Sequence, residues 1–176
     1  LSNEVLKELP FRLTSSQNKV LNEINSDLKS NIRMFRIVQG DVGSGKTIVS
    51  LLSICNVIES KRQCALMAPT EILAKQHFAL AQKLFKDKFK VSFLTGKTEL
   101  KQKKLIIENL RKGIVDLIIG THSLFQKKID FKNLGFVVID EQHKFGVKQR
   151  SDLAKKGGDN CDVLLMSATP IPRTMM

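Results

Sequence analysis

Short apolar runs recur along the chain, and stretches with helical periodicity separate several of them. The runs are rich in Val, Ile, Leu and Phe and occupy residues 34–39, 64–68, 91–94, 116–119, 136–139 and 163–166. Runs that are apolar at nearly every position predict strands covered on both faces, which is typical of parallel sheets. We therefore expect an α/β protein with a mostly parallel central sheet and helices on both faces.

A glycine-rich segment lies between the first apolar run and an apolar helical stretch at 48–58. It matches the phosphate-loop pattern G-x-x-x-x-G-K-[ST] at every fixed position and comprises Gly40, Asp41, Val42, Gly43, Ser44, Gly45, Lys46 and Thr47. Gly40, Gly43 and Gly45 are expected to take positive φ, so that backbone N–H groups surround an anion at the N-terminus of the next helix. The pattern predicts that a nucleoside triphosphate binds here. The alternative is an ordinary glycine-rich turn between a strand and a helix.

The chemistry expected of this loop needs a cation and a metal ion. Lys46 supplies a point charge for the β- and γ-phosphates, and the Thr47 hydroxyl is expected to bind Mg²⁺. The apolar run at 136–139 ends in Asp140 and Glu141. In a phosphate-loop enzyme the first acid holds Mg²⁺ and the second polarises the attacking water, so we assign Asp140 to the metal and Glu141 as the base. Without the loop, the two acids would be an ordinary solvated strand end.

Length and charge narrow the choice of partner. The 176 residues suit a single domain, and 29 Lys and Arg against 17 Asp and Glu give a net charge of +12. A basic domain favours a polyanionic partner, nucleic acid first, although a lysine-rich surface that only aids solubility would give the same charge. The lysine cluster, which we expect to contact DNA phosphates in part, comprises lysines 83, 86, 88, 90, 97, 101, 103 and 104. The chain has no Trp and no Tyr, so recognition of backbone and shape is expected.

Cysteine spacing and hydropathy indicate the compartment. Cys55, Cys64 and Cys161 are widely spaced beside apolar runs, which predicts buried thiols and no metal site. Unpaired thiols fit a reducing compartment, and no apolar run approaches the roughly 18 residues of a membrane span. We expect a cytoplasmic protein without a membrane partner. Because the chain begins with Leu1 and stops directly after a motif, we also expect it to be a fragment of a longer protein.

Segments along nearly the whole chain resemble superfamily 2 helicases, and within them the RecG family of DNA helicases. They lie at 40–47, 67–77, 94–96, 120–122, 139–147 and 167–174, in the order of that family. The Asp-Glu-Gln-His sequence at 140–143 favours the RecG family over the transcription-repair coupling factor Mfd, which typically has Asp-Glu-Glu-His. The resemblance implies a RecA-like phosphate-loop fold for residues 1–176 that binds ATP and Mg²⁺.

The resemblance implies roles for further residues. Gln17, preceded by Phe11, resembles the family's adenine-reading glutamine. The same Gln17 completes a capping box with Thr14 before a helix with an apolar face, and one amide could not serve both roles fully. Gln142 and His143 are implied to couple nucleotide state to motion, together with the Ser-Ala-Thr sequence at 167–169.

Loops that follow three predicted strands resemble the family's DNA-backbone contacts. The residues concerned are Pro69, Thr70, Glu71, Gly96, Lys97, Thr121 and His122. Taken alone, Thr70 would simply cap a helix and Gly96 would simply turn the chain. His77 and His122, taken alone, favour packing or surface roles.

The function implied is that of the first RecA-like motor domain of a RecG-like, ATP-dependent DNA helicase or translocase. Such a protein acts on branched or forked DNA in repair and recombination, as a monomer with a second RecA-like domain and a wedge domain. The arginines of that second domain stabilise transition-state charge, so weak hydrolysis is expected of this chain alone. The alternatives are an Mfd-like translocase on double-stranded DNA and a nucleotide-gated DNA-binding module. A kinase or GTPase is more distant, since no Asn-Lys-x-Asp motif is present.

Overall fold

Six parallel strands form one central sheet. The computed structural model describes residues 2–7, 9–140 and 155–168. The strand order is β1-β6-β5-β2-β4-β3, and every neighbouring pair is parallel. The strands are β1 Phe35–Gln39, β2 Gln63–Met67, β3 Val91–Leu94, β4 Leu117–Gly120, β5 Leu134–Asp140 and β6 Asp162–Ser167. The predicted α/β class and parallel sheet are confirmed, and each predicted apolar run coincides with a strand.

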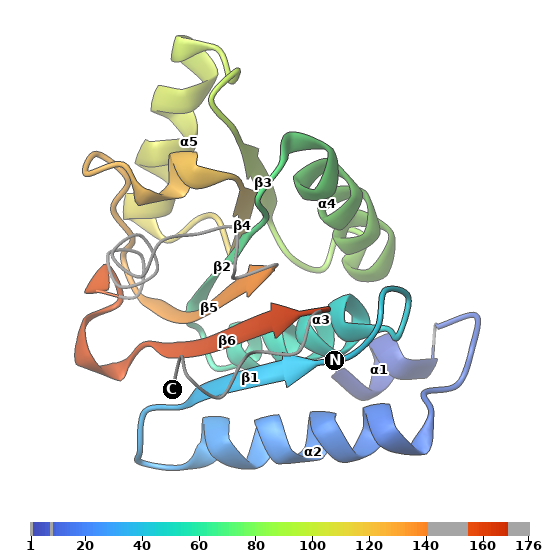
Figure 1. Ribbon diagram of the computed structural model, residues 1–176. Helices are drawn as coiled ribbons and strands as arrows, with labels where there is room; N and C mark the ends of the chain where they lie inside the picture. Colours follow the sequence, from blue (N-terminus) through green and yellow to red (C-terminus); the bar gives the residue numbers. More distant parts are fainter. Residues whose placement is uncertain (1, 8, 141–154, 169–176) are drawn as a thin grey trace, which may run out of the picture.

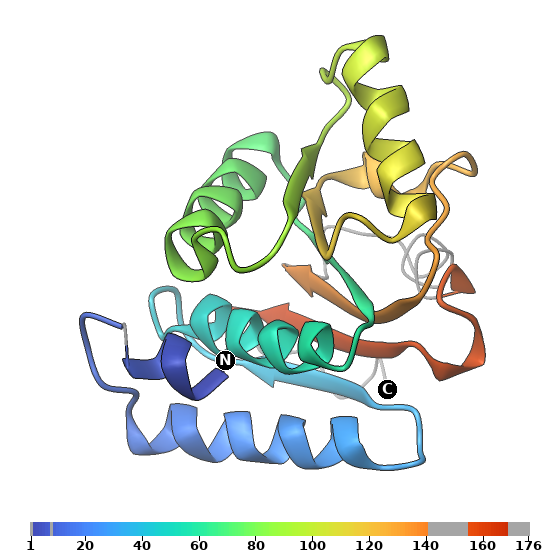
Figure 2. The same cartoon turned by 180° about the vertical axis from the view of Figure 1, so that it is seen from behind.

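Helices connect the strands and cover both faces of the sheet (Figure 1). They are α1 Ser2–Lys7, α2 Ser15–Lys29, α3 Lys46–Glu59, α4 Glu71–Phe85 and α5 Leu100–Lys112, with short 3₁₀ turns η1 His122–Phe125 and η3 Gly158–Asn160. In Figure 2, α3 lies in front of β1 and β6. The predicted cover of helices on both faces is confirmed by the packing described next.

Alternate residues of the central strands pack into two cores, one on each face of the sheet. On one face, Leu66 and Leu164 pack with apolar residues of α1, α2, α3 and α4. On the other face, Ala65 and Leu165 pack with α5 and η1. This alternation follows from the period of two in a strand, and burial on both sides explains why the central strands are apolar at successive positions.

The edge strand β1 departs from the expectation that strands are covered on both faces. Phe35 and Ile37 on its outer face are 66% and 39% exposed. On its other face, Arg36 forms ion pairs with Glu23 and Asp27 of α2, each at 2.7 Å. In the described part of the chain, β1 has a hydrogen-bonded neighbour on one side only, so an apolar pattern alone overstated its burial.

All six strands point the same way, so the loops that follow them gather at one edge of the sheet. The phosphate loop follows β1, and the segments at 68–71, 95–99 and 121–122 follow β2, β3 and β4. Asp140 is the last residue of β5. The carboxyl edge of an α/β sheet is where ligands bind, and the phosphate loop, Asp140 and the three predicted DNA loops lie at it. The lysines at 83–90, between the end of α4 and the start of β3, lie at the opposite edge.

Candidate nucleotide and DNA site

The phosphate loop has the backbone that an anion site requires. Gly43 and Gly45 take φ of 82° and 84°, and Gly45 caps the N-terminus of α3. Gly40 does not take positive φ, which corrects the expectation for that glycine. It is instead needed for space, because a Cβ there would lie 2.8 Å from the Ser44 hydroxyl oxygen. The loop begins beside the last residue of β6, since the Gly40 N–H donates to the Ser167 carbonyl at 3.2 Å.

Lys46 lies over its own loop. Its Nζ donates to the carbonyl oxygens of Gly40 at 2.5 Å and Asp41 at 2.9 Å. These contacts hold the ammonium group beside the loop's N–H groups, where it adds its full charge to the positive end of α3. The neighbouring Thr47 hydroxyl has no hydrogen bond within the described residues. The arrangement is suited to a triphosphate with a bound cation.

Gln17 joins the start of α2 to the phosphate loop. Its Oε1 accepts from the Thr14 N–H at 2.9 Å, and its own N–H donates to the Thr14 hydroxyl at 3.2 Å. This is the predicted capping box. The Nε2 of the same amide donates to the Ser44 carbonyl at 2.8 Å, a contact that the sequence did not reveal. A Cβ on Gly45 would lie 2.2 Å from that Nε2, so Gly45 gives the amide room to approach.

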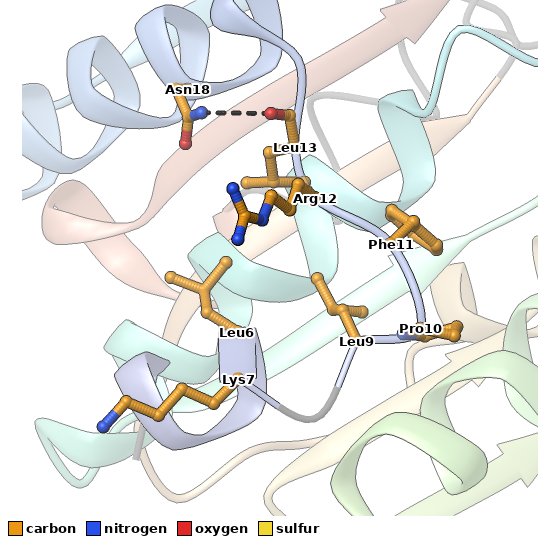
Figure 3. Close-up of a pocket in the computed structure, with 8 residues that line it drawn as sticks. All are labelled: Leu6, Lys7, Leu9, Pro10, Phe11, Arg12, Leu13 and Asn18. Carbon is orange, nitrogen blue, oxygen red and sulfur yellow. Dashed lines mark hydrogen bonds between the residues drawn. The ribbon is translucent and has the colours of Figure 1, made fainter.

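A pocket of about 640 Å³ lies between α1 and the first turn of α2 (Figure 3). It is lined by Leu6, Lys7, Leu9, Pro10, Phe11, Arg12, Leu13 and Asn18. Phe11 is 48% exposed, and Asn18 donates to the Leu13 carbonyl at 3.3 Å. Asn18 follows Gln17 directly, so the pocket adjoins the turn that contacts the phosphate loop. An exposed aromatic ring in such a pocket offers a flat surface to a purine base.

Asp140 is buried at the end of β5 and paired with a histidine from α4. The distance between Asp140 Oδ2 and His77 Nε2 is 2.6 Å, and the two residues are 7% and 6% exposed. Asp140 Oδ1 accepts no hydrogen bond from the described residues. Sequence reasoning missed His77. The available signal was its place among Ala74 and Ala81 on the buried stripe of α4, where a polar residue needs a partner.

Several predicted site residues lie outside the described part of the chain. They are Glu141, Gln142, His143 and Thr169. Ser167 of the coupling motif is described and is buried at the end of β6. Within the described residues no group of three His, Cys, Asp or Glu could hold a metal ion. An ion near Asp140 would therefore draw most of its ligands from phosphates and water, as Mg²⁺ commonly does.

The three loops predicted to contact DNA lie close together. Thr70 caps α4, with its hydroxyl accepting from the Leu73 N–H at 3.2 Å. Glu71, in the first turn of α4, pairs with Lys75 at 3.0 Å and with Lys97 of the β3 loop at 3.4 Å. The hydrogen bond from Lys75 is the main cause that lowers the pKa of Glu71. The Glu71–Lys97 ion pair thus links the first turn of α4 to the β3 loop.

The β4 loop adjoins the β3 loop through close backbone contact. The Thr121 N–H donates to the Leu94 carbonyl at 3.4 Å, and a Cβ on Gly120 would lie 2.1 Å from that oxygen. Thr121 is 5% exposed, whereas Gly96 and His122 are exposed. Thr121 therefore offers little hydroxyl surface to a phosphate, and Gly96, Lys97 and His122 form the exposed part of these two loops.

The three cysteines are buried, as predicted. Cys55, Cys64 and Cys161 are unpaired and buried. Burial raises the pKa of Cys55 and of Cys161 to about 11, and it also raises the pKa of Cys64 well above its usual range. Thiols held neutral are packing groups rather than nucleophiles or metal ligands. No helix within the described residues is long and apolar enough to cross a membrane.

Comparison with known proteins identifies similar chains. Residues 14–176 match the model of the DEAD/DEAH box helicase family. The chain is 52% identical over 167 residues to the ATP-dependent DNA helicase RecG of Streptococcus pneumoniae, covering 95% of this chain and 25% of that protein. It is 48% identical over 174 residues to the RecG of Aquifex aeolicus, covering 98% and 22%. The chain thus spans about a quarter of the length of these relatives.

Solved structures give the same result for the fold. RecG bound to a three-way DNA junction matches with a TM-score of 0.87 and 45% identity, covering 99% of this chain and 23% of that one. The DEAD-box helicase Mss116 bound to single-stranded RNA and UDP-BeF matches with a TM-score of 0.76 and 24% identity, covering 99% and 39%. At that identity the second likeness concerns the fold alone.

Proposed function

The chain belongs to the DEAD/DEAH box helicase family, and from this premise we propose that it is the ATP-binding motor domain of a RecG-like, ATP-dependent DNA helicase or translocase. One observation carries the proposal. The phosphate loop, Asp140 and the three candidate DNA loops share one edge of a single parallel sheet. Nucleotide and DNA are therefore expected to bind to the ends of neighbouring strands, as a motor that converts nucleotide state into DNA movement requires.

On the nucleotide side, the N–H groups of the loop and the N-terminus of α3 would bind the phosphates of ATP, and Lys46 would neutralise their charge. Thr47 and Asp140 would hold Mg²⁺. The residues fit this ion, because the Thr47 hydroxyl and Asp140 Oδ1 have no hydrogen bond within the described residues. When bound, Mg²⁺ supplies charge neutralisation at the β- and γ-phosphates. We assign Glu141 as the base that orients the attacking water, and Gln142 and His143 as coupling residues.

Gln17 retains the atoms needed to read adenine. A primary amide has two N–H donors and a carbonyl oxygen with two lone pairs. The capping box uses one lone pair and the Ser44 carbonyl uses one N–H. One donor and one acceptor remain, which matches the acceptor N7 and donor N6 of adenine. Phe11 lines the pocket of Figure 3 together with Asn18, the residue that follows Gln17. With Phe11 stacked on the base, Gln17 would select ATP and contact the phosphate loop at once.

On the DNA side, we assign backbone contacts to the loops after β2, β3 and β4. The residues are Pro69, Thr70, Glu71, Gly96, Lys97, Thr121 and His122. The N-terminus of α4 and the exposed N–H groups of the loops suit phosphate oxygens. Glu71 holds Lys97 in place rather than contacting DNA through its carboxylate, which phosphates would repel. The lysine cluster would add a sequence-independent attraction.

The whole protein would be longer than this chain. We propose a monomer in which a second RecA-like domain and a wedge domain complete the motor and engage branched DNA in repair and recombination, in the cytoplasm. Arginines of the second domain would supply transition-state stabilisation, so this chain alone would hydrolyse ATP weakly. The resemblance to RecG proteins does not favour an Mfd-like translocase or a nucleotide-gated binding module.

The test is ATP hydrolysis by the full-length protein with forked DNA, single-stranded DNA and no DNA. Stimulation that is strongest with the fork supports the proposal. Equal rates in all three conditions would contradict it. A Lys46→Ala variant of the same protein checks that the measured hydrolysis comes from this site.

A further inference from the structure

The contact between His77 and Asp140 joins the proposed metal ligand to the helix that begins at the candidate DNA surface. We propose that His77 is a positioning residue, which fixes the Asp140 carboxylate for the metal ion and makes metal–nucleotide binding and DNA binding depend on each other through α4. The inference rests on the proposed function, to which it adds His77 and a coupling between the metal site and the DNA surface through α4.

His77 and Asp140 form a buried pair whose chemistry suits a metal-binding carboxylate. The side chains of His77 and Asp140 are 8% and 10% exposed, and their 2.6 Å contact uses Asp140 Oδ2. A buried carboxylate without a partner is costly, so the histidine is needed to keep this group inside. A carboxylate held through one oxygen presents the other in a fixed direction. Partners of this kind orient metal ligands and typically change metal affinity ten- to a hundredfold when removed.

The position of His77 in the fold connects α4 with the end of β5. β5, which ends at Asp140, lies directly beside β2, and α4 follows β2 after a short loop. His77 is the seventh residue of α4, roughly 9 Å along the helix axis from Glu71 at a rise of about 1.5 Å per residue. The His77–Asp140 contact therefore links the end of β5 directly to α4, in addition to the backbone hydrogen bonds between β5 and β2.

The N-terminal end of α4 lies at the candidate DNA surface. Its cap is Thr70, and its first turn is tied to the β3 loop by the Glu71–Lys97 ion pair at 3.4 Å. The body of the helix is buried through Ala74, Ala81 and Leu84, so we expect α4 to move as one rigid element. A shift of the first turn when a DNA phosphate binds would displace His77, and with it the carboxylate. Coupling of this kind acts equally in both directions.

Two substitutions separate a positioning role from a structural one. His77→Leu fills the buried position with an apolar side chain and removes the hydrogen bond to Asp140. His77→Gln keeps a donor at a similar distance from the backbone. Gln76→Leu, on the exposed side of the same turn of α4, is the matched control.

The first measurement is the affinity for a fluorescent ATP analogue, titrated with Mg²⁺ and repeated in EDTA. His77→Leu should raise the Mg²⁺ concentration for half-maximal binding about tenfold while leaving the affinity in EDTA unchanged. His77→Gln should recover most of this loss, and Gln76→Leu should match the wild type. A leucine variant whose affinities fall equally with and without Mg²⁺ has only lost structure, and that outcome overturns the inference.

The second measurement is duplex DNA affinity of the full-length protein, with and without the Mg²⁺–ATP analogue. The wild type should show a ratio of affinities of about fivefold or more, the range of ordinary site–site coupling. The ratio should approach one for His77→Leu and persist for Gln76→Leu. An unchanged ratio in His77→Leu contradicts the coupling. A wild type that binds neither nucleotide nor DNA would instead refute the proposed function, so the two failures are distinct.

Discussion

Gln17 donates a hydrogen bond from Nε2 to the Ser44 carbonyl at 2.8 Å, while its Oε1 closes the capping box of α2. One amide thus stabilises a helix start and the centre of the phosphate loop. The contact is possible because position 45 lacks a side chain. Gln17 and Gly45 should therefore depend on each other energetically.

Substitution of the loop glycines should reveal that dependence. Gly43→Ala and Gly45→Ala both place a side chain at positive φ, which costs about 1–2 kcal/mol. A Cβ at position 43 meets nothing within 4 Å, whereas one at position 45 lies 2.2 Å from Gln17 Nε2. Gly45→Ala should lower the free energy of unfolding by about 1 kcal/mol more than Gly43→Ala does, because it also breaks the bond to Ser44.

A double-mutant cycle in chemical denaturation checks the assignment. The Gln17→Ala, Gly45→Ala double variant should lose less unfolding free energy than the sum of the losses in the two single variants. Gly43→Ala combined with Gln17→Ala should be additive. Additivity in both cycles would show that the Gln17 amide does not constrain the loop.

Lys46→Ala should lower nucleotide affinity by roughly a hundredfold. The substitution removes a charge-assisted contact to phosphate worth about 3 kcal/mol, or roughly a hundredfold in affinity. It also removes the bonds to the Gly40 and Asp41 carbonyls, so unfolding should become easier by about 1 kcal/mol. Calorimetric titration with ATP measures the first effect and denaturation the second. Lys104→Ala, an exposed lysine of α5, should bind ATP normally, and retained affinity in Lys46→Ala would refute the assigned role.

Lys97→Ala should weaken DNA binding at every sequence. The side chain is 84% exposed and held toward α4 by Glu71. Loss of one phosphate contact should reduce the slope of log affinity against log salt concentration by about one. Titration of labelled duplex at several salt concentrations gives the slope. Lys112→Ala, at the far end of α5 in an ion pair with Glu108, serves as the control. A slope that falls equally in both variants would rule out a specific contact at Lys97.

Alkaline pH should destabilise the fold through the buried thiols. In the unfolded chain a cysteine has a pKa near 9.0, whereas burial raises the pKa of Cys55 and Cys161 to about 11. Between those pH values the folded state binds more protons than the unfolded state, so the free energy of unfolding falls as pH rises. Urea unfolding from pH 8 to 11 measures the trend. A Cys55→Ala, Cys161→Ala variant should lose less stability over that range, and an equal loss would assign the effect to other groups.

The sequence predicted the parts of this molecule that depend on local pattern. Central strands such as β2 and β5 are buried on both faces, and this leaves an uninterrupted apolar signal. The phosphate loop is one continuous segment with fixed spacing. The capping box of Thr14 and Gln17 is equally local, and the structure reproduces it.

Features made by residues far apart in the chain were not predicted. His77 and Asp140 are 63 positions apart, and Gln17 and Ser44 are 27 apart. No local spacing signals that such residues meet, because the meeting depends on strand order. The exposed outer face of β1 was missed for the same reason, since an apolar pattern does not reveal whether a strand lies at the edge of a sheet. Strand order is a property of the whole chain.

The pairing of β1 with β6 has a consequence for the order of folding. Among the strands that the structure describes, β1 pairs with β6 alone, and the Gly40 N–H at the start of the phosphate loop donates to the Ser167 carbonyl. On the ribosome the loop is made well before β6, the strand that anchors it. Contacts across so much of the chain are slow to form, so a nascent chain should acquire ATP affinity only after β6 has emerged. Nucleotide capture is then a late sign of a completed sheet.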